Sequence, residues 1–157
     1  MTSMIEVTVY RVTTISDEVL AAAQLLAPQL ESSNQVNITP EYLERIISSP
    51  DNVWLMARRT ADNKLIGMAS LVIMPMPTNI RANLENVVVD RGARDIGAGI
   101  ALCAAAKDIA DEQNVNTLRA AASKSNAASQ RMLQKAGFEV ETSMDYLELI
   151  IVKGSRL

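Results

Sequence analysis

A short segment with two glycines, spaced as in phosphate-binding turns, follows a run of three valines. It reads Arg94-Asp95-Ile96-Gly97-Ala98-Gly99 and comes shortly after Val87-Val88-Val89. A helix that begins in such a turn leaves its first amide N–H groups unpaired, and its dipole adds partial positive charge there. Glycine lets the backbone approach a phosphate, and the Arg94 guanidinium can add a charge-assisted contact. The segment therefore predicts a pyrophosphate-binding turn.

Three known kinds of phosphate site begin with a strand, a glycine-containing turn and a helix. A dinucleotide fold uses G-x-G-x-x-G, but Leu102 stands where the third glycine belongs. A P-loop uses a lysine at the start of the helix, and no lysine occurs there. The pattern R/Q-x-x-G-x-G/A is met at all its fixed positions. On these six residues alone, a tight turn beside a solvated arginine is an equally good interpretation.

Composition limits the classes of protein and of partner. The chain has 157 residues, 48% of them apolar and 21% charged, which predicts one folded domain over residues 1–157. A net charge of -3 disfavours a nucleic-acid partner. No apolar stretch is long enough to span a membrane, so we expect a soluble cytoplasmic protein without a membrane partner. There is no histidine, which excludes His-based triads and most zinc sites, and we expect no metal. The lone Cys103 is expected to be a buried small apolar residue.

Periodicity and turn residues divide the chain into alternating strands and helices. Strands are predicted at Met4–Val12, Val53–Arg58, Leu65–Ile73, Ile80–Asp90 and Val115–Ala121, with one or two more within Phe138–Val152. Helices are predicted from Thr14 or Ser16 to about Leu30, from Thr39 to before Pro50, from Gly97 to Gln113, and from Ser125 to Gly137. The order is β-α-α-β-β-β-α-β-α-β. It predicts an α/β fold with a mixed, mostly antiparallel central sheet and helices on both faces.

Two blocks of sequence together resemble the GNAT (GCN5-related N-acetyltransferase) superfamily. The first is Leu84–Asp90 followed by the Arg94 motif. The second is Asn126-Ala127-Ala128 with Leu133–Phe138, which is similar to the family's N-x-A and K-x-G-F signature. Their order and spacing, with the matching order of strands and helices, make the resemblance specific, and it covers most of the chain.

The resemblance implies that acetyl-CoA binds where two strands of the sheet separate. The backbone of the three valines would pair with the pantetheine arm, the amides from Asp95 to Ile100 would hold the pyrophosphate, and Asn126 would reach the thiol end. The alternatives are a buried strand for the valines and a helix N-cap for Asn126. The full set of expected cofactor-binding residues is Val87, Val88, Val89, Arg94, Asp95, Ile96, Gly97, Ala98, Gly99, Ile100, Asn126 and Ser129.

The implied reaction is direct acetyl transfer to an amine in a ternary complex. An amine must lose a proton to attack, and Glu85 is the candidate base, because many members of the family carry an acidic residue there. Glu85 is alternatively a solvated charge or the partner of an arginine. Leu133 occupies the position where the family often has a tyrosine that protonates the leaving thiolate. Ser129, Tyr10 and Tyr146 are candidate substitutes.

Other functions stay open at this stage. A CoA-binding regulatory module that has lost catalysis is the main alternative, and a nucleotide-binding oxidoreductase is disfavoured by the missing third glycine. The acceptor is a small-molecule amine or a peptide amine, and the sequence does not distinguish them. By analogy Tyr42 or the loop around Met74–Met76 lines the acceptor site, with core packing and a surface loop as alternatives. Similar proteins often form dimers, which leaves a homodimer open.

Overall fold

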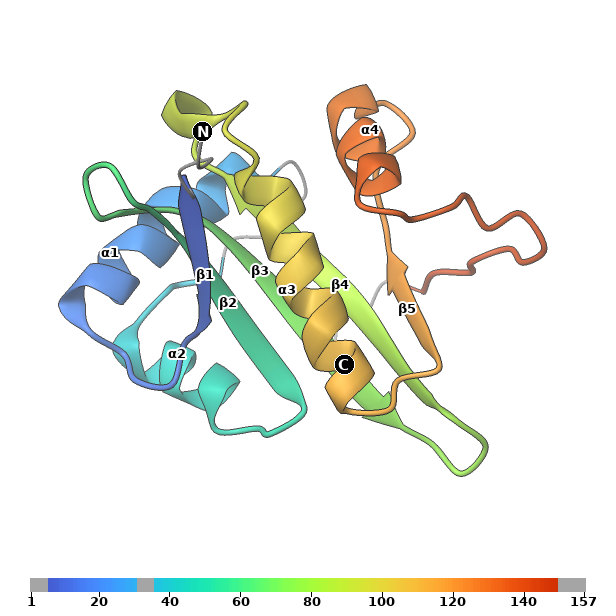
Figure 1. The fold of residues 1–157 in the computed structure, drawn as a ribbon. Helices are drawn as coiled ribbons and strands as arrows, with labels where there is room; N and C mark the ends of the chain where they lie inside the picture. Colours follow the sequence, from blue (N-terminus) through green and yellow to red (C-terminus); the bar gives the residue numbers. More distant parts are fainter. Residues whose placement is uncertain (1–5, 31–35, 150–157) are drawn as a thin grey trace, which may run out of the picture.

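The structure, a computed structural model, describes residues 6–30 and 36–149. In this part of the chain one sheet holds the strands in sequence order (Figure 1). They are β1 (Val7–Arg11), β2 (Asn52–Arg59), β3 (Lys64–Pro75), β4 (Ile80–Val89) and β5 (Thr117–Ala120). β1 to β4 pair antiparallel, and β5 pairs parallel to β4. The predicted mixed, mostly antiparallel sheet is therefore confirmed.

Three of the four α-helices in the described residues begin at polar capping residues. The helices are α1 (Asp17–Leu26), α2 (Pro40–Ile47), α3 (Ala98–Glu112) and α4 (Ala127–Lys135), with short 3₁₀ turns η1 (Ala27–Gln29) and η2 (Arg91–Ala93). The side chains of Ser16, Thr39 and Asn126 each accept a hydrogen bond from the amide three residues on. These bonds satisfy donors that a helix start leaves unpaired. α1 ends earlier than predicted because Pro28 cannot donate to the helix ladder, and the chain tightens into η1.

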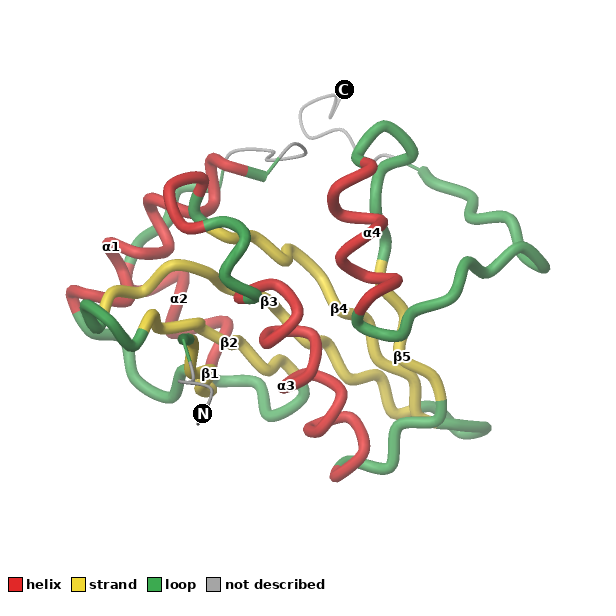
Figure 2. Tube along the Cα trace, turned by 45° about the horizontal axis from the view of Figure 1, so that its top comes forward, coloured by secondary structure: helices red, strands yellow, loops and turns green. Residues whose placement is uncertain are grey.

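The helices cover both faces of the sheet, as predicted. Val53, Leu55 and Ala57 alternate along β2 and pack with α3 and α4 in one buried cluster. Trp54 and Met56 point the other way and pack with α1 and α2 in a second cluster. Figure 2 shows α3 crossing one face of the sheet, with α1 and α2 behind the strands. The period-two alternation of β2 thus separates two apolar layers.

The strand expected after α4 is absent from the described residues. Residues 138–149 form no helix or strand, and residues 150–152 of the predicted range lie outside the described residues, as do Met4 and Ile5 of the first strand. Phe138 packs against the core, but the apolar side chains after it do not. Leu147 is 97% exposed and Leu149 is 79% exposed. Alternating apolar residues form a strand only where another strand edge pairs with them, and this segment has no such partner among the described residues.

Candidate functional site

Strands β4 and β5 separate halfway along β4. Their pairing runs from Arg81 and Thr117 to Leu84 and Ala120, where β5 ends. β4 continues to Val89 and pairs with β3 on its other side. On the side facing α4, the backbone of Glu85–Val89 has no strand partner among the described residues. At the end of this segment, Arg94 Nε makes a weak 3.5 Å contact with the Val89 carbonyl. An extended molecule can therefore add to this edge as a strand does.

A β-bulge lies at the point of separation. Val88 pairs with Met68 and Glu85 with Ser70, so Asn86 and Val87 together face the single residue Ala69. Asn86 has φ of 54°, in the left-handed region that asparagine tolerates better than most side chains. A bulge interrupts the ladder and turns the neighbouring groups away from the sheet. Asn86 is therefore the place where backbone groups of β4 are freed toward a ligand.

The Arg94–Gly99 segment forms the turn that the sequence predicts. Asp95 and Gly97 both have positive φ, 71° and 84°, and α3 begins at Ala98. Gly97 is the N-cap and offers no side chain to the helix. The first bond that closes the helix runs from the Ala101 amide to the Gly97 carbonyl, 2.9 Å long. The amides of the first helical turn therefore have no acceptor among the described residues and remain available to an anion.

A groove of about 1150 Å³ joins the free edge of β4 to this helix start. All but one of the residues proposed for catalysis or cofactor binding line it. They are Glu85, Val87, Val88, Val89, Arg94, Asp95, Gly97, Ala98, Gly99, Ile100, Asn126 and Ser129. The exception is Ile96, whose side chain packs against the core. Its backbone amide stays a prediction.

Three cations in the groove were missed by the sequence analysis. Arg91, Arg131 and Lys135 line it together with Arg94, against the two carboxylates of Glu85 and Asp95. Such a lining favours a polyanion. The signal for Arg131 and Lys135 lies in α4, where they are spaced with Ala128 and Met132 as i, i+3, i+4 and i+7, and all four line the groove. That spacing marks one helix face and could have been recognised.

The two glycines of the turn differ in their surroundings, which adds a packing role to the one predicted for Gly99. A Cβ at Gly97 would meet nothing within 4 Å, and its positive φ is what favours glycine there. A Cβ at Gly99 would lie 3.2 Å from Cγ of Met132 in α4. The absence of a side chain at Gly99 thus permits close packing of α3 on α4, in addition to any room it leaves for a phosphate.

Glu85 stands in a row of side chains that crosses the sheet. Trp54 pairs with Ser70, and Ser70 pairs with Glu85. Directly paired residues point to the same face of a sheet and lie close together. Glu85 is exposed and lines the groove, while Ser70 and Trp54 line a second cavity on the face covered by α1 and α2.

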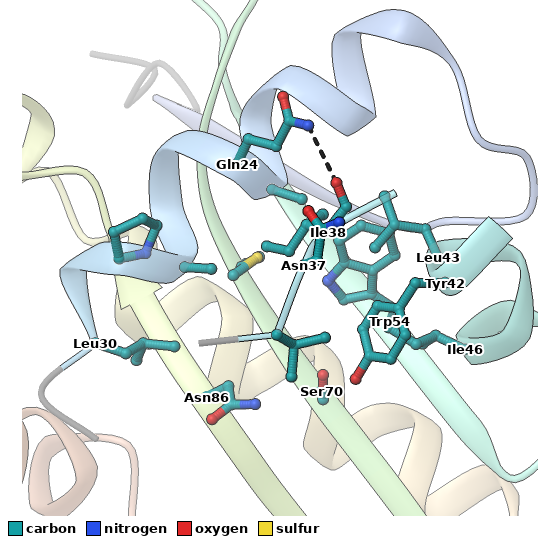
Figure 3. A pocket seen from close by; sticks show the side chains of 15 residues that line it. Gln24, Leu30, Asn37, Ile38, Tyr42, Leu43, Ile46, Trp54, Ser70 and Asn86 are labelled. Atoms are coloured by element: carbon teal, nitrogen blue, oxygen red, sulfur yellow. Dashed lines mark hydrogen bonds between the residues drawn. The ribbon is translucent and has the colours of Figure 1, made fainter. Parts of the chain in front are cut away.

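The second cavity, drawn in Figure 3, has a volume of about 670 Å³. It meets the groove at the bulge. Leu30 and Asn86 belong to the linings of both cavities. Tyr42, proposed for the acceptor side, lines this cavity, and so does the buried Trp54. The Met74–Met76 loop contributes to neither cavity. The two cavities and the bulge between them form the candidate active site.

The candidate proton donors are placed differently from one another. Leu133 is buried in the core and does not line the groove, so this position is a packing position here. The ring of Tyr10 lies 5.7 Å from the Arg58 guanidinium carbon, and Tyr146 is 73% exposed; neither lines the groove or the second cavity. Ser129 lines the groove, and its hydroxyl makes no hydrogen bond to any described residue. Asn126 lines it too and caps α4, which confirms the N-cap interpretation; its contact with a cofactor stays a prediction.

The cysteine is excluded as a nucleophile by its surroundings. Cys103 is 2% exposed in the core between α3 and the sheet. Burial raises the pKa of its thiol to about 11, so the reactive thiolate is scarce at neutral pH. Its Sγ lies 3.5 Å from Sδ of Met132, beneath the groove. This confirms the expected role as a small apolar residue.

Comparison with known proteins places the chain in a family. Residues 20–138 match the model of the acetyltransferase (GNAT) family. Because the match covers well over half of the sequence, the chain belongs to the acetyltransferase (GNAT) family.

Solved structures share the fold at low sequence identity. A transcriptional regulator from Bacillus halodurans C-125 superposes with a TM-score of 0.76 at 19% identity, over 92% of this chain and 99% of the other. The glucosamine-6-phosphate N-acetyltransferase from Arabidopsis thaliana gives 0.70 at 16%, over 92% and 99%. An aminoglycoside acetyltransferase from an uncultured soil metagenomic sample, in complex with sisomicin, gives 0.75 at 14%, over 93% and 97%. At these identities the likeness establishes the fold.

One further comparison found nothing, and neither did a search of the described residues for membrane-spanning helices. No protein of curated function matches the sequence. Within residues 6–30 and 36–149, no helix is both long and apolar enough to cross a membrane.

Proposed function

We propose that the protein is an acetyl-CoA-dependent N-acetyltransferase that moves the acetyl group directly to an amine. The observation that carries this proposal is the meeting of two chemically different cavities at the Asn86 bulge. One is a cationic groove with free backbone groups, and the other is an uncharged pocket. Two substrates that enter from the two sides would react at the bulge without a covalent enzyme intermediate.

The groove has the parts that coenzyme A requires. The free edge of Val87–Val89 would hydrogen-bond the amides of the pantetheine arm, since these lie along an extended chain and can pair with a strand edge. The first turn of α3 and Arg94 would hold the pyrophosphate. Arg91, Arg131 and Lys135 line the same groove and would neutralise further phosphate charge. The residues therefore fit a long, polyanionic molecule with a neutral amide-containing arm.

Glu85 would act as the base, because it lines the groove and lies one residue from the bulge. In the proposed reaction acetyl-CoA supplies the acetyl group as a thioester: a carbon–nitrogen bond forms, the carbon–sulfur bond breaks with its electron pair going to sulfur, and Glu85 takes the amine proton. A backbone N–H freed at the bulge would donate to the acetyl carbonyl oxygen as charge develops on it. Ser129 would donate a proton to the leaving sulfur, because it is the one of the three candidate donors that lines the groove.

A calorimetric titration with acetyl-CoA, followed by a transfer assay that detects free CoA thiol, tests the proposal. We expect saturable binding and amine-dependent release of CoA. Absence of binding at millimolar acetyl-CoA would overturn it.

A second candidate, a CoA-binding module without catalysis, is favoured by one observation. The position of the family's proton-donating tyrosine is Leu133, which is buried in the core. The same two measurements separate the candidates. Tight acetyl-CoA binding without transfer to a broad panel of amines would support the module, whereas transfer supports the enzyme. Proton donation typically contributes about 10²–10⁴-fold, so loss of a donor is compatible with measurable activity.

A further inference from the structure

The second cavity has no charged side chain in its described lining. Of the 15 residues that line it, the polar ones carry amides or hydroxyl groups, and the rest are apolar. The polar members besides Tyr42 are Gln24, Asn37, Ser70 and Asn86. The amide of Gln24 is already used, since its Nε2 donates to the Ile38 carbonyl at 3.1 Å.

The apolar part of the cavity is built by aromatic and branched side chains. Figure 3 shows the indole of Trp54 and the ring of Tyr42 toward one end, close to Leu43 and Ile46 from α2. Ser70 and Asn86 lie on the strands at the floor, with Asn86 toward the end where the groove begins. Trp54, Leu43 and Met68 are buried, so these walls are fixed by core packing. The pocket is therefore a preformed apolar surface.

The charge nearest to this pocket in the cross-strand row is that of Glu85. Glu85 pairs across the strands with Ser70, which pairs with Trp54. Glu85 itself lines the groove, next to the bulge where the two cavities meet. A cation that enters the pocket can meet this carboxylate at the bulge, where transfer would occur. A second cation deeper in the pocket would meet no carboxylate among the described lining residues. A phosphate there would meet no arginine or lysine among them.

We infer that the acceptor is a small primary monoamine with an apolar body, whose amine faces the Asn86 bulge and whose alkyl or aryl part lies against Trp54 and Tyr42. This inference rests on the proposed function and specifies its substrate class. A volume of about 670 Å³ is within the range of small-molecule sites. The class differs from aminoglycosides, which carry several amines, and from amino-sugar phosphates, because both bring charges that the described lining leaves unpaired.

The apolar pocket also assists the chemistry. A charged ammonium loses hydration when it enters apolar surroundings, which favours its neutral form. The neutral form is the one that attacks. A modest base at the bulge is then sufficient to take the proton, as proposed for Glu85.

A series of linear amines tests the inference. Transfer from acetyl-CoA is measured for propylamine through hexylamine, for 2-phenylethylamine, and for 1,6-diaminohexane, glucosamine 6-phosphate, an aminoglycoside and a lysine-containing peptide. We expect kcat/KM to rise about fourfold with each methylene, as apolar area is buried. We expect hexylamine to exceed 1,6-diaminohexane by at least about tenfold, because the second charge is desolvated without a partner. A flat or falling series, or preference for a charged acceptor or for the peptide, would overturn the inference.

Trp54 provides a readout that does not depend on catalysis. It is the only tryptophan in the chain, so its emission reports on this pocket alone. Hexylamine should saturably shift the emission, because it changes the surroundings of the indole, while glucosamine 6-phosphate should leave it unchanged. No shift with any alkylamine, in a protein that binds acetyl-CoA calorimetrically, would overturn the acceptor class and leave the proposed function standing. Failure to bind acetyl-CoA would overturn the proposed function itself.

A charge placed in the pocket should change its preference. Ile46→Glu puts a carboxylate on a half-buried lining position of α2, and Leu25→Glu is the matched control on the exposed face of α1. We expect Ile46→Glu to lower the ratio of hexylamine activity to 1,6-diaminohexane activity by about tenfold, because the new carboxylate pairs with the second ammonium of the diamine. Leu25→Glu should leave that ratio as in the wild type. An equal effect of the two variants would contradict the placement of the amine.

Discussion

The two cavities on either side of the Asn86 bulge are lined by opposite chemistry. The groove presents four cations, a free strand edge and the start of α3. The pocket presents aromatic and branched side chains, with no charge in its described lining. They share Asn86 of β4 and Leu30. The free edge of β4 thus faces one ligand, side chains of β2, β3, α1 and α2 face the other, and the bulge is where the two cavities meet.

This contrast has a structural cause. The edge of a strand exposes backbone hydrogen-bonding groups, which any extended polar molecule can use. The face of a sheet exposes side chains, whose types vary with the sequence. The groove therefore depends mainly on backbone geometry, and the pocket depends on which residues α1, α2 and the neighbouring strands bring to the face. Substitutions should accordingly affect the two cavities separately.

The largest effect is expected at the junction, from Glu85→Gln. If Glu85 takes the amine proton, kcat/KM should fall about 10²–10⁴-fold while calorimetric affinity for acetyl-CoA stays within a factor of two. Glu112→Gln, at the exposed end of α3, is the control and should keep full activity. Retained activity in Glu85→Gln would remove this carboxylate from the reaction and leave it as a solvated charge.

A smaller effect, confined to the groove, is expected from Arg94→Ala. Loss of one charge-assisted hydrogen bond to phosphate should weaken acetyl-CoA binding by about 10–100-fold. The emission shift of Trp54 with hexylamine should be unchanged, because Arg94 does not line the pocket. Arg45→Ala, an exposed arginine of α2, serves as the control. Equal weakening by both variants would indicate a general effect of charge.

Leu133→Tyr tests whether the missing tyrosine can be restored. Leu133 is 8% exposed in the core, so a larger side chain should destabilise the protein by about 1–3 kcal/mol without raising activity. Leu133→Met, which conserves volume, should cost less than about 1.5 kcal/mol. Denaturant unfolding measures both. An increase in kcat for Leu133→Tyr would show that this position reaches the groove after all.

The smallest effect concerns Cys103, beneath the groove. Its pKa of about 11 lies above the ordinary 9.0, so the folded protein should resist iodoacetamide at pH 8 while the unfolded chain reacts. Because the folded-state pKa is raised, stability should be unaffected below pH 9 and should fall as the pH rises toward 11. Cys103→Ala should lack this fall. Rapid labelling of the native protein would mean that the groove floor is open.

The sequence predicts the groove better than the pocket. The Arg94–Gly99 turn and the valine strand are each a single short stretch of sequence, so their roles can be recognised from the local pattern. The bulge cannot be recognised from the sequence. Asn86 adopts the left-handed region there, but the only trace of this in the sequence is an asparagine, a common residue. The pocket depends on the pairing register of Trp54, Ser70 and Glu85, which are far apart in the chain.

The end of the fold shows the same limit. The residues from Phe138 onward have a clear strand alternation, and the described ones form no strand because no neighbouring edge pairs with them. Helix starts were predicted well, since Ser16, Thr39 and Asn126 act through amides three residues away. Hydrogen bonds between residues close in the sequence can therefore be predicted from it, whereas the pairing of distant strands cannot.

A crystal structure with acetyl-CoA bound tests the account most directly. It should show the pantetheine arm along Glu85–Val89, the pyrophosphate at the first turn of α3, and the acetyl group at Asn86, facing the pocket that contains Trp54. An acetyl group held away from the bulge, or a cofactor bound outside the groove, would contradict the account.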